Sequence, residues 1–369
     1  MLVQKYDVAA YIWPAYTGKE GRTLIFWPDG HGEWETVKDA TARFPGHLWP
    51  RKPLWGYRDE ADPEVMEQQI DEAADHGVNV FIYDWYWYDN RPFLEQCLND
   101  GFLKAKNRSR MKFYLMWANH DVTYGWDRRI STLDYKTIFW QGSANREQFH
   151  TVAERWMDRY FGLDEYYRID GKPVLSIYDF NNFVNGLGGV ENARREMEWL
   201  DAEAAKRGLG GVHFQMVKFG TAHTNLSGFD APRNFRLSEL MPYLPFSSVT
   251  HYQFAHFADM GRDYGEIMER VREEWREIGS EFTIPYYPHI SIGWDNTPRY
   301  ATNTSSVVKN NTPAAFESAL REARALADRT GVRLITINSW NEWTETSYLQ
   351  PDDLYGYGYL DAVKRVFAE

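Results

Sequence analysis

Two glutamates lie three residues apart near the end of the chain, in the run Trp340-Asn341-Glu342-Trp343-Thr344-Glu345. Cleavage of a glycosidic bond requires such a pair, because one carboxyl group protonates the leaving oxygen while the other assists attack at the anomeric carbon. The neighbouring Trp340 and Trp343 would desolvate one carboxyl group and raise its pKa, as a general acid near neutral pH requires. The spacing alone is more typical of acidic side chains that solvate a loop or begin a helix. The position of the pair after a predicted strand, between tryptophans, makes a catalytic role for Glu342 and Glu345 about as well supported as a structural one.

Other hydrogen-bonding and aromatic side chains also stand at or just after short apolar runs. A pocket rimmed by aromatic rings and carboxylates suits a neutral carbohydrate, because flat apolar sugar faces stack on aromatic rings. A phosphorylated ligand would need basic groups or a Gly-rich helix start, and only Lys218 and Arg299 are well placed for that. From their positions we predict contacts with a carbohydrate for Asp84, Trp85, Trp117, Asn119, His251, Tyr252, Tyr286, His289, Trp294 and Trp340.

Three histidines, His120, His251 and His289, each follow a predicted strand and could together bind a metal. The sequence has no HExxH or HxH spacing, so we expect these rings to form hydrogen bonds with substrate or with a glutamate instead. The single cysteine, Cys97, excludes an internal disulfide and a Cys-based zinc site. We therefore predict neither a metal nor another cofactor.

The elements that must position these residues alternate in one order along the chain. Runs rich in β-branched and aromatic residues, typical of strands, are followed by longer stretches with the apolar spacing of helices. The predicted strands cover residues 8–14, 78–88, 112–119, 173–180, 212–219, 248–254, 283–292 and 333–343. The predicted helices cover residues 63–76, 92–104, 146–162, 190–206, 264–278, 312–329 and 358–367, and residues 234–240 are a weaker candidate.

Eight strands in strand-then-helix order predict a parallel sheet, and eight such units in this length fit a (β/α)8 TIM barrel. A doubly wound open sheet is the alternative, and it would usually carry a Gly-rich turn after its first strand. The long segment that follows the first strand, about residues 15–63, contains no GxGxxG. We predict an α/β fold with a single barrel over residues 1–369 and an insertion at about 15–63. Either fold places the chemistry past the C-terminal ends of the strands.

Composition excludes several other classes of function. Lys and Arg total 41 and Asp and Glu total 53, so the net charge is −12, which disfavours nucleic acid and anionic membranes as partners because both require a basic surface. The sequence contains no run of about 18 apolar residues, so we expect no membrane span. The N-terminal segment lacks the apolar run and cleavage site of a signal peptide. The sequence as written therefore predicts a cytoplasmic protein, whereas a trimmed leader would leave a periplasmic or secreted location open.

The sequence resembles glycoside hydrolase family 99-like proteins, also described as WbsX-like. Residues 340–345 carry the resemblance, together with Pro351-Asp352 and residues 356–360 after them. Further matching segments are 44–47, 56–57, 64–69, 77–88, 117–119 and 293–299, with Pro53 between them, so that the resemblance covers nearly the whole chain.

The resemblance implies a (β/α)8 barrel and retaining cleavage of the kind carried out by endo-acting α-mannosidases. It implies that Glu345 is the acid/base catalyst. It also implies that Glu342 removes the proton of the sugar's 2-hydroxyl, which attacks the anomeric carbon to give an epoxide-like intermediate. The expected substrate is an oligosaccharide or polysaccharide with an α-linked, neutral, mannose-like or rhamnose-like residue.

Two other functions remain open at this point. WbsX-like proteins are also described as glycosyltransferases of polysaccharide biosynthesis, although this sequence has no DxD motif for a metal-bound nucleotide sugar and no basic cradle for its diphosphate. The chain would alternatively be a non-catalytic glycan-binding barrel, in which the glutamate pair only accepts hydrogen bonds.

Overall fold

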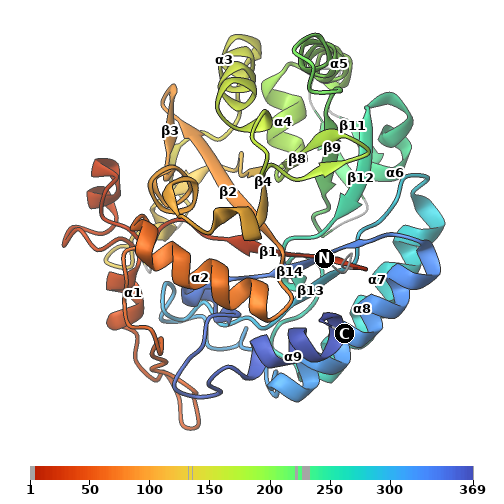
Figure 1. The fold of residues 1–369 in the computed structure, drawn as a ribbon. Helices are drawn as coiled ribbons and strands as arrows, with labels where there is room; N and C mark the ends of the chain where they lie inside the picture. Colours follow the sequence, from red (N-terminus) through yellow and green to blue (C-terminus); the bar gives the residue numbers. More distant parts are fainter. Residues whose placement is uncertain (1–4, 132, 135, 221–222, 227–232, 369) are drawn as a thin grey trace.

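The computed structural model describes residues 5–131, 133–134, 136–220, 223–226 and 233–368. Eight parallel strands form a barrel, which confirms the predicted (β/α)8 fold. Figure 1 shows the helices arranged around it. In chain order the strands are β1 (Asp7–Ile12), β2 (Val80–Tyr88), β4 (Lys112–Trp117), β8 (Lys172–Ile177), β9 (His213–Val217), β12 (Phe246–Thr250), β13 (His289–Ser291) and β14 (Leu334–Asn338).

The strands pair around the barrel in the same order in which they follow one another along the chain. The hydrogen-bonded order is β12-β9-β8-β4-β2-β1-β14-β13, and all these pairs are parallel. A single bridge between Val249 and Tyr286 joins β12 to the segment before β13 and closes the ring. All nine residues of β2 are buried, as expected for a strand covered on both faces.

Six of the predicted helices are present on the outside of the barrel, with shifts at their ends. They are α2 (Pro63–Asp75), α3 (Arg146–Trp156), α5 (Val190–Lys206), α7 (Tyr264–Glu281), α8 (Pro313–Thr330) and α9 (Gly358–Phe367). Several begin at the capping side chains that their sequences offer: Asp62, Asn145, Asp263 and Thr312 each accept a hydrogen bond from the first turn. A shorter helix, α4 (Phe180–Gly186), precedes α5.

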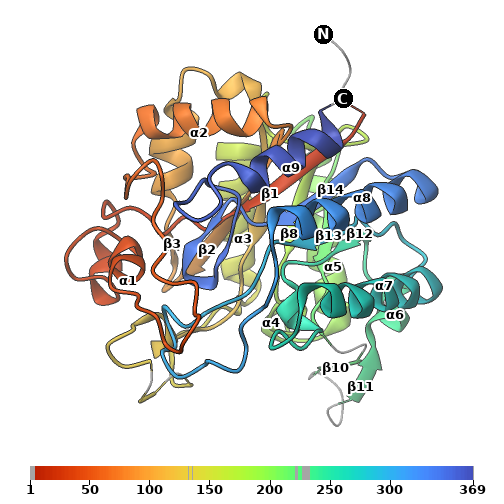
Figure 2. The ribbon, with the colours of Figure 1, turned by 90° about the horizontal axis from the view of Figure 1, so that it is seen from below.

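The structure corrects two helix predictions. Residues 92–104 form the short strand β3 (Arg91–Phe93), a π-helical turn (Cys97–Gly101) and a 3-10 turn (Phe102–Lys104). A Cβ atom at Gly101 would lie 2.4 Å from the carbonyl oxygen of Glu60, so the segment passes too close to its neighbour for a larger residue. In the segment 234–240, β11 (Arg233–Arg236) pairs with β10 (His223–Leu226), and only the single turn α6 (Leu237–Leu240) is helical. Figure 2 shows this hairpin projecting from the edge of the barrel.

The insertion after β1 folds over the C-terminal end of β14. Its regular structure is limited to a 3-10 turn (Gly21–Ile25) and the helix α1 (Trp34–Lys38). The Trp49 Nε1 group donates a hydrogen bond to Thr346 Oγ1 (3.0 Å), and His47 Nε2 lies 2.6 Å from Asp295 Oδ2. The insertion therefore contacts the segments that follow β13 and β14, where the paired glutamates lie. Among the residues that the structure describes, no helix is long and apolar enough to cross a membrane.

Candidate active site

A cavity of about 390 Å³ lies among residues at and beyond the C-terminal ends of the barrel strands. Glu342 and Glu345 both line it, together with Asp84 and Arg299. Its aromatic lining residues are Trp13, Tyr86, Trp126, Tyr178, Phe219, Tyr252, Trp294 and Tyr300. The cavity thus combines carboxyl groups with aromatic rings, which is the composition that the sequence led us to expect.

A tight turn after β14 brings the two glutamates to one cavity. The pair of short strands β15 (Asn341–Glu342) and β16 (Ser347–Tyr348) encloses a 3-10 turn at Trp343–Glu345. The Glu342 N–H group donates to Ser339 Oγ (2.7 Å), and the Asp295 N–H group donates to the Glu345 carbonyl oxygen (2.8 Å). Both ends of the turn are therefore fixed by hydrogen bonds from the backbone.

The two tryptophans of this motif are fully buried and stabilise the turn through ring stacking and hydrogen bonds. The Trp343 ring stacks on Tyr348 with their centroids 3.8 Å apart, and its Nε1 group donates to Gln350 (2.6 Å). The Trp340 Nε1 group donates to Gln69 Oε1 (2.8 Å). Neither ring lines the cavity, so the structure places Trp340 away from the carbohydrate contact that we predicted for it.

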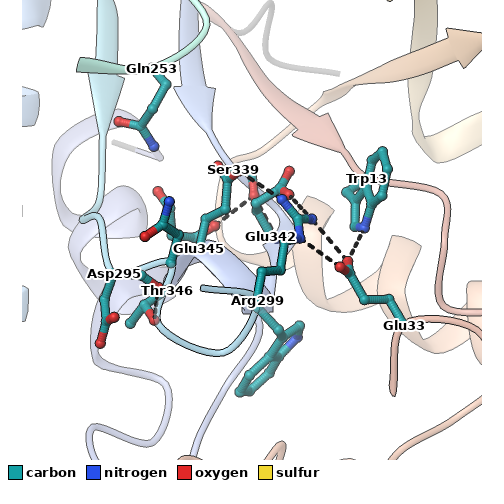
Figure 3. A network of polar contacts seen from close by, with 12 residues as sticks. Trp13, Glu33, Gln253, Asp295, Arg299, Ser339, Glu342, Glu345 and Thr346 are labelled. Atoms are coloured by element: carbon teal, nitrogen blue, oxygen red, sulfur yellow. Dashed lines mark hydrogen bonds and ion pairs between the residues drawn. The ribbon is translucent and has the colours of Figure 1, made fainter. Parts of the chain in front are cut away.

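One guanidinium connects both glutamates to a third carboxylate (Figure 3). Arg299 Nη1 lies 2.8 Å from Glu345 Oε1, and Nη2 lies 3.0 Å from Glu342 Oε1. Its Nε and Nη2 atoms also hold Glu33, at 2.6 and 3.0 Å. Glu33 accepts a further hydrogen bond from Trp13 Nε1, and the guanidinium lies over the Trp13 ring, 5.4 Å from its centroid. The arginine thereby fixes the positions of both candidate catalytic groups.

The two glutamates differ in how strongly they hold a proton. Burial, followed by the negative charge of Glu342, raises the pKa of Glu345 to about 8, and Arg299 only partly opposes this. Burial also raises the pKa of Glu342, against the opposing effects of Arg299 and of a hydrogen bond from Tyr252. Both carboxyl oxygens of Glu342 accept hydrogen bonds, whereas among the described residues Arg299 is the one donor to the carboxyl group of Glu345. The surrounding hydrogen-bond donors therefore favour the ionised form of Glu342 more than that of Glu345, so Glu345 holds its proton more strongly.

Tyr252 links Glu342 to a further carboxyl group. Its hydroxyl oxygen lies 2.9 Å from Glu342 Oε2 and 3.0 Å from Asp84 Oδ2. Burial, followed by the charge of Glu342, raises the pKa of Asp84 well above its usual value. Asp84, Tyr252 and Trp294 are the three predicted carbohydrate contacts that the structure brings to the cavity.

The predicted contacts Trp85 and Trp117 face away from the cavity. Successive side chains of a strand point to opposite faces, so that inward-facing Asp84 is followed by outward-facing Trp85. The Trp85 Nε1 group donates to Glu95 (2.9 Å), and Trp85 and Trp117 each pack edge-on against Trp156 of α3. They belong to the packing between the strands and α3.

The remaining predicted contacts are engaged in hydrogen bonds within the barrel. Asn119 exchanges two hydrogen bonds with the backbone of Asp179, at 2.7 and 2.8 Å, and so ties the end of β4 to the end of β8. His251 lies 2.9 Å from the hydroxyl of Tyr286, and His289 lies between two hydroxyl groups at 2.9 and 3.0 Å. None of these four side chains lines the cavity, so the structure gives them positioning roles.

His120 reaches the cavity, but burial lowers its pKa and keeps its ring neutral. Across the described ranges, no group of three or more His, Cys, Asp or Glu side chains could hold a metal ion. The buried histidines instead use their ring nitrogens for hydrogen bonds with hydroxyl, carboxyl and carbonyl groups.

Sequence reasoning missed Glu33 entirely and gave Arg299 no catalytic role. Glu33 belongs to the insertion, whose sequence has no periodic pattern that would place a side chain. Arg299 offered one usable signal, because it follows a predicted strand and is one of the few basic residues in that position. Tyr86 also had a signal, since it lies two positions after Asp84 and therefore faces the same side of β2.

Comparisons with known proteins agree with this architecture. A family model described as "Glycosyltransferase WbsX" matches residues 9–363. The "uncharacterized protein WxcX" of Xanthomonas campestris pv. campestris (strain B100) is 27% identical over 347 residues, which are 92% of this chain and 46% of WxcX. The chain thus spans about half the length of the curated relatives it matches.

Solved glycoside hydrolase structures share the fold at low sequence identity. The GH99 endo-alpha-mannosidase from Bacteroides thetaiotaomicron has a TM-score of 0.59 and 16% identity, over 98% of this chain and 95% of that chain. A "glycoside hydrolase-like protein" has a TM-score of 0.62 and 16% identity, over 100% of this chain and 95% of its own. At such identities the similarity establishes the barrel fold and leaves the chemistry to the residues of the cavity.

Proposed function

The chain belongs to the family described as glycosyltransferase WbsX, and from the geometry of its cavity we propose that it is a retaining glycoside hydrolase. The observation that carries this proposal is the pair Glu342 and Glu345, held on one guanidinium and differing in proton affinity. A glycosidase requires a carboxyl group that is protonated at neutral pH beside one that is ionised. Glu345 and Glu342 supply these two forms.

In the first step, Glu345 donates its proton to the glycosidic oxygen as the bond to the anomeric carbon breaks. Glu342 removes the proton of the sugar's 2-hydroxyl, and that oxygen attacks the anomeric carbon to close an epoxide ring. In the second step, Glu345 removes a proton from a water molecule that opens the ring at the anomeric carbon, and Glu342 returns its proton to O2. Two inversions give net retention, and both glutamates regain their starting protonation states.

Arg299 suits this sequence of proton transfers. When Glu345 loses a proton and Glu342 gains one, the total charge of the two carboxyl groups beside the guanidinium does not change. A buried site therefore avoids creating an additional uncompensated charge, which would be costly in a medium of low polarity.

The proposed substrate is a neutral glycan with an α-linked, mannose-like or rhamnose-like residue. Attack by O2 needs the leaving oxygen on the opposite face of the ring, as in an α-linked sugar with an axial 2-hydroxyl. The guanidinium of Arg299, the cationic group that the described cavity contains, is already bound by Glu33, Glu342 and Glu345, so the cavity disfavours an anionic sugar.

The family's description favours a second candidate, a glycosyltransferase that uses a nucleotide sugar. Such an enzyme must neutralise a diphosphate, whereas the basic side chains that line the described cavity are Arg299 and the neutral His120. Three carboxyl groups already engage Arg299. Calorimetry with a panel of nucleotide sugars tests this alternative: we expect no binding, and micromolar binding would favour the transferase.

Reducing-end release from α-mannosidic and α-rhamnosidic glycans tests the hydrolase directly. We expect proton NMR to show the α anomer as the first product, before mutarotation. Initial appearance of the β anomer would refute retention. A substrate with a 2-O-methyl group should not be cleaved, and its efficient cleavage would refute attack by the 2-hydroxyl.

A further inference from the structure

The Tyr252 hydroxyl lies between two carboxyl groups and has only one hydrogen to offer. Its oxygen is 2.9 Å from Glu342 Oε2 and 3.0 Å from Asp84 Oδ2, and both are hydrogen-bonding distances. An ionised carboxylate can only accept, so two ionised carboxylates would leave one of these contacts without a hydrogen. The three groups must therefore share a second hydrogen, which one of the two carboxyl groups carries.

The surroundings of the two carboxyl groups place this hydrogen on Asp84. Glu342 is held by the guanidinium of Arg299 at 3.0 Å, which favours its ionised form. Asp84 is only 3% exposed, and its Oδ1 atom is buried without a hydrogen-bond partner in the part of the chain that the structure describes. An ionised carboxylate in this position would leave a charge with little compensation, whereas a neutral acid would not.

We propose that Asp84 is a neutral, protonated positioning residue whose hydrogen directs the Tyr252 hydroxyl toward Glu342. Asp84 Oδ2–H donates to the Tyr252 oxygen, and Tyr252 O–H donates to Glu342 Oε2. Glu342 consequently keeps its charge, while its other oxygen remains bound to Arg299. This inference rests on the proposed function for its catalytic consequence, and it assigns Asp84 and Tyr252 a role other than the carbohydrate contact predicted from the sequence.

Asp84, Tyr252 and Glu342 form a relay of hydrogen bonds, and among the described residues the other groups around this relay supply no cation to Asp84. The tyrosines of the adjoining elements have pKa values well above their usual value because they are buried, so they stay neutral. The titratable groups around the relay are Tyr11 on β1, Tyr16 after it, Tyr86 and Tyr88 on β2, Tyr178 after β8, His256 after β12, and Glu33, Arg299 and Glu345. The His256 ring stacks on Tyr252 with their centroids 6.0 Å apart, and burial lowers the pKa of His256 to about 3, so this ring stays neutral as well.

Asp84→Asn tests the proposal because the amide N–H can donate to Tyr252 as the protonated acid does. The hydrogen-bond pattern around Tyr252 is therefore kept. The acid limb of the pH profile, which reports ionisation of Glu342, should not move. If Asp84 were ionised, the substitution would remove a negative charge beside Glu342, shift that limb to lower pH and disrupt the site, and this result would overturn the proposal.

For Tyr252→Phe, in contrast, we expect both a loss of kcat/KM and a shift of the acid limb of the pH profile. Loss of a hydrogen bond to a charged group should lower kcat/KM by about 10- to 100-fold. Because that hydrogen bond lowers the pKa of Glu342, the acid limb should move to higher pH. Tyr114→Phe is the matched control: Tyr114 is a buried strand tyrosine whose hydroxyl donates to Gln215 (3.1 Å), and its loss should leave the limb in place. An unmoved limb in Tyr252→Phe would contradict the relay.

Infrared spectroscopy separates the relay from the proposed reaction. At pH 7 the parent should show a carbonyl stretch of a protonated carboxyl group that the Asp84→Asn difference spectrum assigns to Asp84. If the parent cleaves no glycan but this band is present, the relay stands and the proposed function fails. If the band is missing, the relay is refuted even in an active hydrolase.

Discussion

At the scale of single residues, one arginine binds three carboxyl groups and holds the candidate active site together. Arg299 binds Glu33, Glu342 and Glu345 within 3.0 Å, and all four residues are buried or nearly so. A buried charge is tolerated when it is paired and hydrogen-bonded, so the arginine makes a cluster of acids possible at this position. The same crowding makes the two carboxyl groups that we propose as catalytic unequal, because the carboxyl group of Glu345 has fewer donors than that of Glu342.

The raised pKa of Glu345 predicts the alkaline limit of activity. The acid form of Glu345 donates the proton to the leaving group, so activity is present below its pKa and is lost as the pH rises through about 8. The pH profile of kcat/KM between pH 4 and 10 measures this limit. Constant activity up to pH 10 would contradict the assignment of Glu345 as the acid.

At the scale of elements, the insertion after β1 completes the site. It supplies Glu33 to the arginine, and it holds the turn after β14 through His47 and Trp49. The sequence predicted the existence and the length of this insertion but none of its contacts, because it lacks the periodic pattern of a helix or strand. In contrast, the barrel strands were predictable from their apolar runs, which burial on both faces requires.

Glu33→Gln tests the contribution of the insertion. It removes one charge from the bidentate contact with Arg299, so we expect kcat to fall by about 10- to 100-fold, the effect of a weakened charged hydrogen bond, with little change in KM. Glu20→Gln is the matched control, because Glu20 pairs with Arg22 on the same insertion at 3.2 Å and does not line the cavity. Equal loss of kcat in both variants would indicate a general effect on the insertion.

At the scale of the whole molecule, the eight barrel strands and the acidic composition could be predicted from the sequence. The sequence did not predict which side chains at the strand ends meet in the cavity. A shift of one position along a strand decides whether a residue faces inward or outward. Asp84 and Trp85 are adjacent in sequence yet lie on opposite sides of β2. Predictions based on position alone therefore included residues from both faces.

The engagement of Arg299 by three carboxyl groups also predicts a selectivity for neutral sugars. Replacing the neutral sugar at the cleaved bond by its uronic acid should lower kcat/KM by about 100-fold or more, since an uncompensated like charge costs several kcal/mol in a desolvated site. Competition between the paired neutral and anionic glycosides measures the ratio. Preference for the uronic acid would contradict the proposed substrate class.

The most direct test of the central claim is Glu345→Gln assayed with two leaving groups. For an unactivated glycan, loss of the general acid should lower kcat/KM by about 100- to 10,000-fold. For an aryl glycoside whose phenol leaves without protonation, the same variant should retain most of its activity in the step that breaks the bond, measured as the initial burst of phenol. Equal losses for both substrates, or full activity of the variant on the glycan, would contradict the role of Glu345 as the proton donor.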